Sequence, residues 1–523
     1  MSETTTALPA NVRRYAKYLL VMAGLGGLIY GIDVGVIAAA LPYVRNTSNY
    51  SSVQLGFIVG AVLWGSVLSS LFAGSLAEWF GRKKIIIASA FCFFVSIPVI
   101  CLSGLFDGGN FILLTLGRTL QGASAGLVGV VVPMYLAECL DSDSRGKGTG
   151  MFQLLLTIGL AFAAVIGLVV TGWVGDSDKI LKPFIEETAA AAGVEPSKFE
   201  VTFEMIKGWV SADQIKGWSM AWQTIFLCSA IPGLILFLGA FGLKESPRWL
   251  YKKGRTDEAL ASLAANNGEA KAKLILDEMI AADKAEADEK AAIAAAAKGD
   301  SLFQRKFVYP FLLAVVILGC NQATGINSVL NYTVDIFKAT GMEGVFANFS
   351  DLAIKLVNVF MTIVACALVD KRGRKFLLKL GTAGIILGLC GVATTFLLIT
   401  KGVVAASMTT GVIATVFFFM FIAFYAVGPG VCVWLALSEL MPTRIRATGM
   451  SIAMIINQGV SATIATVFPA WKDAWGFPAV FYCLAGFTVV YFVTAAFFLP
   501  ETKGRTLEEI EQYFKTGKMP EKA

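Results

Sequence analysis

Twelve long apolar segments run through the chain, and they constrain its fold more than any other feature. A helix of about 20 apolar residues spans the hydrocarbon core of a bilayer. The segments cover approximately residues 18–41, 53–76, 85–105, 111–137, 148–173, 222–243, 307–331, 349–369, 376–400, 406–438, 447–469 and 477–499. The sequence therefore predicts an all-α membrane protein with twelve transmembrane helices.

The composition fits a membrane protein and excludes other classes. Hydrophobic residues make up 56% of the 523 residues, charged residues only 15%, and the mean hydropathy is +0.70. The net charge of +6 comes from short basic clusters between apolar segments, so no nucleic-acid partner is expected. The sequence has no histidine, phosphate loop or metal-ligand cluster, so it indicates neither an enzyme nor a bound cofactor. Asp and Glu remain for proton chemistry in the membrane.

Basic residues gather in the connections that follow the even-numbered segments. Arg82-Lys83-Lys84 follows the second segment and Lys371-Arg372 the eighth, whereas residues 106–110 carry no basic side chain. The positive-inside rule places the basic connections, and with them both termini, in the cytosol. We expect a multi-pass protein of the cell inner (cytoplasmic) membrane, surrounded by lipid and monomeric.

The spacing of the segments also predicts the domain organisation. The expected units are a cytosolic N-terminus (1–17), an N-terminal six-helix half (18–243) with an external insertion (174–220), a cytosolic helical linker (244–306), a C-terminal six-helix half (307–499) and a cytosolic tail (500–523). The insertion is interpreted as a small helical cap. The linker is either a solvated connection or a regulatory platform.

The two halves repeat one another. The sequence LAEWFGRK at 76–83 matches LVDKRGRK at 368–375 in its acidic residue, glycine and arginine. This match indicates a duplicated six-helix unit and two pseudo-symmetric halves. Halves related in this way place the ligand between them, and rocking of the halves exposes it alternately.

A run of amides, Asn321 to Tyr332, interrupts the seventh apolar segment. Polar groups at that depth are costly unless something pairs with them. Gln322 and Asn331 point to opposite sides of a straight helix, and they converge only if the helix breaks, for which Gly325 is the obvious position. The alternative is that the amides only join helices to one another.

Seven motifs in order resemble the sugar porter branch of the major facilitator superfamily. They are Leu25 to Asp33, Gly117-Arg118 with Pro133 to Glu138, Arg145-Gly146 leading to Gln153, Glu245 to Leu250, the run Asn321 to Tyr332, Gly428 to Glu439, and Pro500 to Arg505. The resemblance covers nearly the whole chain and implies the major facilitator fold.

The resemblance implies a sugar site between the halves. Its expected residues are Gln153, Asn321, Gln322, Asn327, Asn331, Trp434 and Asn457. Amides pair with sugar hydroxyls, and an aromatic ring covers the pyranose face. Asn321 and Asn331 depart from the family pattern, which usually has Gln and Tyr at these positions. A hexose or pentose is the expected substrate, with polyols such as inositol as the alternative.

Asp33 and Arg118 are the deepest charges in the predicted helices, at about 13 Å and 10 Å from the outer ends. Matching depths predict an ion pair that protonation of Asp33 would release. The family resemblance adds that an acid at this position is typical of proton-coupled porters. Sugar:proton symport is therefore expected, with facilitative uniport or a non-transporting sugar sensor as alternatives.

Charged residues also recur at the cytosolic ends of both halves. They are Glu78, Arg82, Glu138 and Arg145 in the first half and Asp370, Arg374, Glu439 and Arg446 in the second. Their paired spacing predicts a cytosolic gate, with salt bridges between the halves that latch the outward-facing state. The alternative is that they only set the topology.

Overall fold

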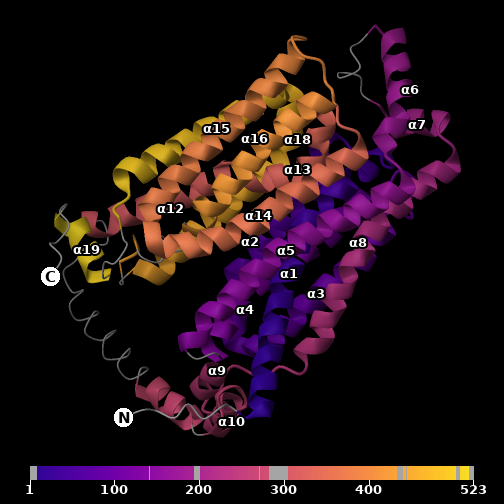
Figure 1. Ribbon diagram of the computed structural model, residues 1–523. Coiled ribbons are helices and arrows are strands. Elements are labelled where there is room, and N and C mark those ends of the chain that lie inside the picture. Colours follow the sequence, from indigo (N-terminus) through magenta and orange to yellow (C-terminus); the bar gives the residue numbers. More distant parts are fainter. Residues whose placement is uncertain are drawn as a thin grey trace.

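The computed structural model describes residues 9–139, 142–193, 201–269, 271–281, 304–432, 440–442, 445–501 and 507–516, and these are almost entirely helical (Figure 1). The N-terminal half consists of α1 (Ala10–Asn46), α2 (Ser52–Phe80), α3 (Arg82–Ser103), α4 (Phe111–Cys139), α5 (Ser142–Val174) and α8 (Ala212–Ala240). The C-terminal half consists of α12 (Arg305–Ala323), α13 (Ile326–Ala339), α14 (Gly344–Arg372), α15 (Arg374–Thr400), α16 (Met408–Val427) and α18 (Arg446–Val493), which ends in the π-helical turn η3 (Thr494–Phe498).

The last apolar helical stretch is too long for one membrane crossing, and this decides how many crossings the chain has. Within the described residues, eleven helical stretches are long and apolar enough to span a membrane, and the last of them, Thr448–Phe498, has 51 residues. It is broken at Gly476, whose φ of 77° and ψ of 162° are not helical. This break makes two crossings of the last stretch, which gives the twelve predicted from the sequence.

Several of the crossings begin earlier than the apolar segments suggest, by about ten residues in α8, which begins at Ala212 rather than near residue 222. Helix α1 begins at Ala10 rather than near residue 18, and α14 begins at Gly344 rather than near residue 349. Polar residues near the helix starts, such as Arg13 of α1, Asp213 of α8 and Asn348 of α14, explain the difference, because hydropathy detects only the apolar part of a helix.

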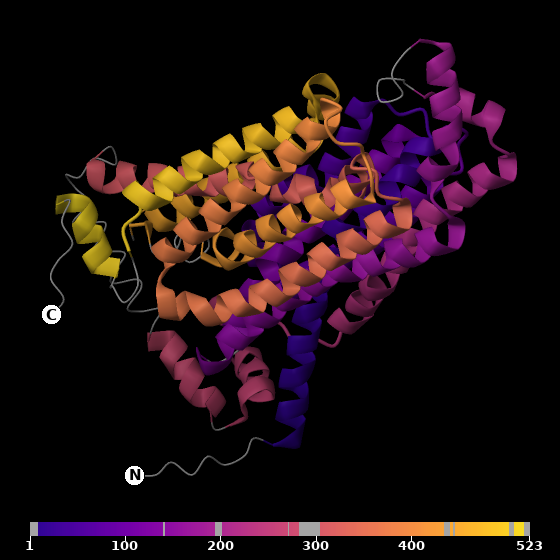
Figure 2. The same cartoon turned by 45° about the horizontal axis from the view of Figure 1, so that its top comes forward.

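Shorter helices lie at both ends of the bundle. The insertion after α5 contains α6 (Ser177–Ala191) and α7 (Phe203–Trp209), and the linker contains α9 (Pro247–Lys252) and α10 (Thr256–Asn267). Figures 1 and 2 show α6 and α7 at one end, and α9, α10, the start of α1 and α19 (Leu507–Thr516) toward the other. We call these the insertion end and the linker end.

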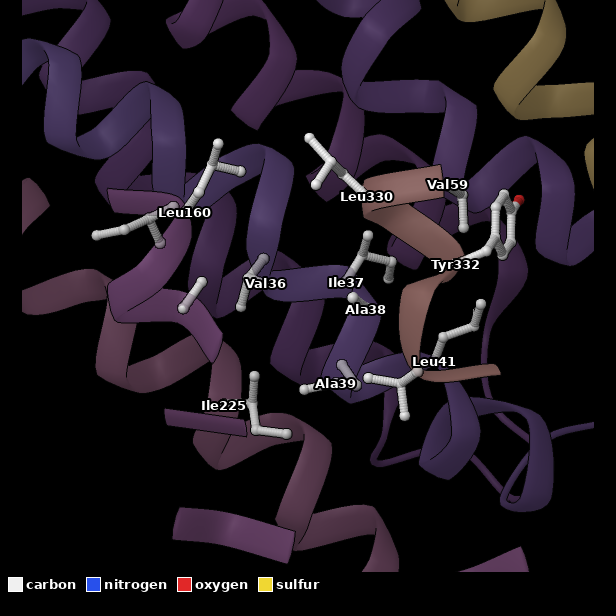
Figure 3. Close-up of a cluster of buried hydrophobic side chains, with 14 of the residues drawn as sticks. Val36, Ile37, Ala38, Ala39, Leu41, Val59, Leu160, Ile225, Leu330 and Tyr332 are labelled. Carbon is white, nitrogen blue, oxygen red and sulfur yellow. The ribbon is translucent and has the colours of Figure 1, made fainter. Parts of the chain in front are cut away.

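Small residues let α1 and α5 approach closely. A Cβ atom on Gly27 would lie 2.2 Å from the carbonyl oxygen of Phe152, and one on Gly31 would lie 1.9 Å from that of Leu156. Only glycine allows backbones to pack at this distance. Figure 3 shows the resulting buried cluster, in which Ile37 of α1 lies near Leu330 and Tyr332 of α13. The outer part of α1 is thus buried between the two halves.

Candidate substrate and coupling site

The predicted break in the seventh crossing is present and brings two amides together. Helix α12 ends at Ala323, Gly325 adopts a left-handed conformation (φ 80°, ψ 15°), and α13 begins at Ile326. The Nδ2 of Asn327 donates to the Oε1 of Gln322 at 3.1 Å across this break. Glycine at 325 is what permits the turn, because other residues rarely adopt positive φ.

Helix α18 completes the amide cluster. The Nε2 of Gln322 donates to the Oδ1 of Asn457 at 3.3 Å, and the Nδ2 of Asn457 donates to the Leu318 carbonyl at 2.9 Å. Asn327 also donates to the Ser461 hydroxyl at 2.7 Å. Gln322, Asn327 and Asn457 are therefore oriented by one another within the C-terminal half. We call these three residues the amide cluster.

Three other predicted sugar-site residues are described by the structure and lie outside this cluster. Asn321 and Asn331 are buried, and the Oδ1 of each has no hydrogen-bond partner among the described residues. Gln153 is exposed on α5 in the opposite half. Trp434 lies outside the described residues. Their contact with a sugar remains a prediction.

Asp33 and Arg118 are both buried in the N-terminal half, with 0% and 1% of their surface exposed. The Nη1 of Arg118 donates to the backbone carbonyl of Asp33 at 3.3 Å and to the Oε1 of Gln121 at 2.9 Å. Neither carboxylate oxygen of Asp33 has a hydrogen-bond partner among the described residues. The predicted carboxylate–guanidinium pair is therefore not formed here, because equal depth does not fix the rotation of either side chain.

At the linker end, the gate residues that are described form contacts within one half. Arg82 pairs with Glu138 at 2.7 Å, joining α3 to α4, and Glu138 also accepts from the Ser246 hydroxyl. The Glu78 carbonyl accepts from the Trp249 indole at 2.8 Å. These contacts fasten the linker to the N-terminal half. They are not the salt bridges between halves that the sequence predicted.

Four other predicted gate residues are not described well enough to show their contacts. The side chains of Arg145, Asp370 and Arg446, and the whole of Glu439, lie outside what the structure describes. The latch between the halves therefore stays a prediction.

The two halves share a capping contact that follows their sequence repeat. Glu245 accepts from the backbone amides of Arg82 at 2.8 Å and Lys83 at 3.0 Å, at the start of α3. In the second half, Glu501 accepts from the amide of Arg374 at 3.2 Å, at the start of α15. Each carboxylate thus satisfies free amides at a helix N-terminus, where negative charge is favoured.

Charged residues that the sequence reasoning missed join the two halves at the insertion end. Lys338 of α13 contacts Asp176 at 2.5 Å and Asp178 at 2.8 Å, and Lys179 contacts Glu343 at 3.0 Å. We call these five residues the insertion clasp. Burial opposes ionisation of Asp178, but Lys338 and Arg45 outweigh it and lower the pKa of Asp178 to about 2.

Further contacts strengthen the same closure. Arg45 of α1 pairs with Asp335 of α13 at 2.5 Å, and the Asp176 carboxylate accepts from the amide of Gly344 at 2.8 Å. Deeper in the bundle, Leu63 and Val67 of α2 pack against α18. The halves are therefore closed at the insertion end. The sequence signal for the clasp is the pair of acids Asp176 and Asp178 at the start of the insertion.

Twelve crossings in two repeated halves, with a broken helix that carries amides, define a secondary transporter. A family model described as "Sugar (and other) transporter" matches residues 19–182 and 202–514. The chain belongs to this family, the sugar porters of the major facilitator superfamily. Members of the family are transporters rather than enzymes.

Curated relatives and solved structures agree with this assignment. The glucose transporter GlcP of Staphylococcus epidermidis is 30% identical over 95% of this chain and 96% of its own. The D-xylose transporter of Levilactobacillus brevis is 29% identical over 94% of each chain. The inward-open structure of the xylose transporter XylE from E. coli covers 95% of this chain and 99% of its own, with a TM-score of 0.71 at 23% identity. The predicted major facilitator fold is confirmed.

Proposed function

We propose that the protein carries a monosaccharide across the cytoplasmic membrane by alternating access, coupled to a proton. The amide cluster carries this proposal. Gln322, Asn327 and Asn457 present donors and acceptors at a helix break, the chemistry that sugar hydroxyls require, and a broken helix near the bilayer midplane is a recurrent substrate site in transporters. Relatives that are named as D-xylose, glucose and arabinose-proton transporters support a sugar as the substrate.

Asp33 supports coupling to a proton. Its carboxylate is buried without a hydrogen-bond partner among the described residues, so an ionised form is poorly stabilised there and a proton would neutralise it. Arg118, held on the adjacent backbone carbonyl, lies close enough to respond to that change. Proton occupancy would thereby bias the two states of the transporter.

The closed insertion end indicates which state of the alternating-access cycle the structure represents. With both termini and the linker in the cytosol, as the basic connections predict, the insertion end faces outward. The structure is then closed to the outside, and the insertion clasp must break before a sugar enters from that side.

Transport by the purified protein in liposomes tests the proposal. Uptake of radiolabelled D-xylose, L-arabinose, D-glucose, D-galactose and myo-inositol is measured with and without an inward proton gradient. Symport predicts accumulation of at least one sugar above equilibrium only when the gradient is present. Equilibration without accumulation would indicate uniport, binding without flux would indicate a sensor, and transport of myo-inositol alone would indicate a polyol carrier.

A further inference from the structure

A buried ion pair lies in the membrane, outside the predicted site. Asp351 and Lys355 on α14 are both 0% exposed, and the Nζ of Lys355 is 2.7 Å from the Oδ2 of Asp351. The earlier start of α14 at Gly344 places Lys355 eleven residues inside the helix, about 16 Å from its outer end. A charge pair at this depth is costly to bury, which makes a role in transport the default expectation.

Lys355 also reaches across to the other half. Its Nζ lies 3.5 Å from the carbonyl oxygen of Gly35 on α1, two residues beyond Asp33. Arg118 contacts the carbonyl of Asp33 itself from α4. Two cations, one from each half, therefore contact the α1 backbone at neighbouring positions. The Arg118 contact lies within one half, but the Lys355 contact exists only while the halves are together.

Helix α1 is confined at this point from the other side as well. A Cβ atom on Gly35 would lie 3.0 Å from the Cβ of Ala163 and 3.2 Å from the carbonyl oxygen of Leu160, both on α5. The backbone of α1 thus lies between α5 and the ammonium group of Lys355. Asp351 in turn fixes that ammonium group from one turn away on the same helix.

We propose that Lys355, held by Asp351, is a positioning residue for proton coupling: it fixes α1 beside Asp33 while the halves are closed at the insertion end. This inference rests on the proposed proton symport. When the insertion end opens, Lys355 leaves the Gly35 carbonyl and α1 is released next to the coupling carboxylate. The contact between Lys355 and the Gly35 carbonyl then links closure of the halves to the environment of Asp33.

The test replaces both charges, because a single substitution would leave one buried charge unpaired. The variant is Asp351→Asn with Lys355→Met. Its matched control is Lys182→Met with Glu186→Gln, which removes the exposed pair of the same spacing on α6. Lys355→Arg keeps the positive charge and is the conservative variant.

Two readouts are taken from full-length protein in liposomes. In a cysteine-free background, Ala462→Cys places a thiol in the packed contact between α18 and Leu63 of α2, and its labelling by an impermeant maleimide reports opening. The second readout is the ratio of proton-driven D-xylose accumulation to D-xylose counterflow. We expect labelling to rise about tenfold and the ratio to fall at least threefold in the double variant, with Lys355→Arg recovering at least half of each change.

The outcomes separate the two proposals. Labelling within twofold of the control pair would overturn the positioning role, and this readout requires no sugar. Increased labelling with an unchanged ratio would overturn the link to Asp33. Absence of counterflow in the unaltered protein, with every sugar of the panel, would instead contradict the proposed function. A merely structural ion pair predicts a lower yield or melting temperature without a change in either readout.

Discussion

Loss of the Lys338 ammonium group should open the transporter at the insertion end. Lys338 joins α13 to Asp176 and Asp178, and the side chains of these three residues are 14%, 8% and 31% exposed. Removing one partner from a fully buried pair costs about 3–5 kcal/mol. Because Asp178 is partly solvated, we discount this to about 2–3 kcal/mol for Lys338→Met.

The loss of this interaction energy destabilises only the state that is closed at the insertion end. When the halves separate at the insertion end, the charges of the clasp pass into water, so the substitution penalises the closed state selectively. A difference of about 2–3 kcal/mol changes the ratio of open to closed molecules by about 30- to 150-fold. Labelling of the thiol in Ala462→Cys by an impermeant maleimide should accelerate by a similar factor while the open state is the minor one.

Lys182→Met is the matched control, since Lys182 is exposed on α6 and pairs only weakly with Glu186 at 3.9 Å. It removes one lysine from the insertion itself, where its partner Glu186 lies on the same helix. A labelling rate for Lys338→Met within twofold of this control would refute the assignment of the clasp as the outer closure.

Three further predictions concern coupling, the helix break and pH. Asp33→Asn should abolish accumulation driven by a proton gradient but leave sugar counterflow intact, and undiminished accumulation would remove Asp33 from the coupling mechanism. Gly325→Ala should lower stability by about 1–2 kcal/mol from its left-handed conformation alone, with a further loss because its Cβ would lie 2.6 Å from Leu484; thermal unfolding and the KM of counterflow measure both effects. The pKa of Asp178 is lowered to about 2, so its contribution to closure is complete above its unpaired pKa near 4 and is lost only as pH falls toward 2. Lys338→Met should therefore accelerate labelling by the same factor at pH 5.5 and pH 8, and a factor that disappears at pH 5.5 would contradict the pairing.

The sequence predicted features that depend on local composition. Hydropathy located the twelve crossings, and a glycine among amides located the break at Gly325 because a left-handed turn requires that residue type. The stretch 174–220 after the fifth crossing was predicted to form a small helical cap, and the structure shows α6 and α7 there. Each of these follows from residues that are close in the chain.

Contacts between distant helices were harder to predict. The depths of Asp33 and Arg118 match, but depth along two helices does not determine which way their side chains turn, and Arg118 contacts the main chain and Gln121 instead. The depth of Lys355 could not be predicted from hydropathy, because Asn348, Ser350 and Asp351 near the start of α14 make the apolar segment begin about five residues after the helix does. Opposite charges four residues apart, Asp351 and Lys355, were nonetheless a readable signal of a buried pair.

The helix caps at Glu245 and Glu501 have a consequence for measuring motion in this transporter. Each carboxylate binds backbone amides of its own half, so neither contact is strained or broken when the halves move apart. The start of α3 and the segment that follows α8 should consequently keep a constant separation throughout the cycle. Spin labels or fluorophores placed there provide an internal reference distance, against which a changing distance to α15 would report the rotation of one half relative to the other.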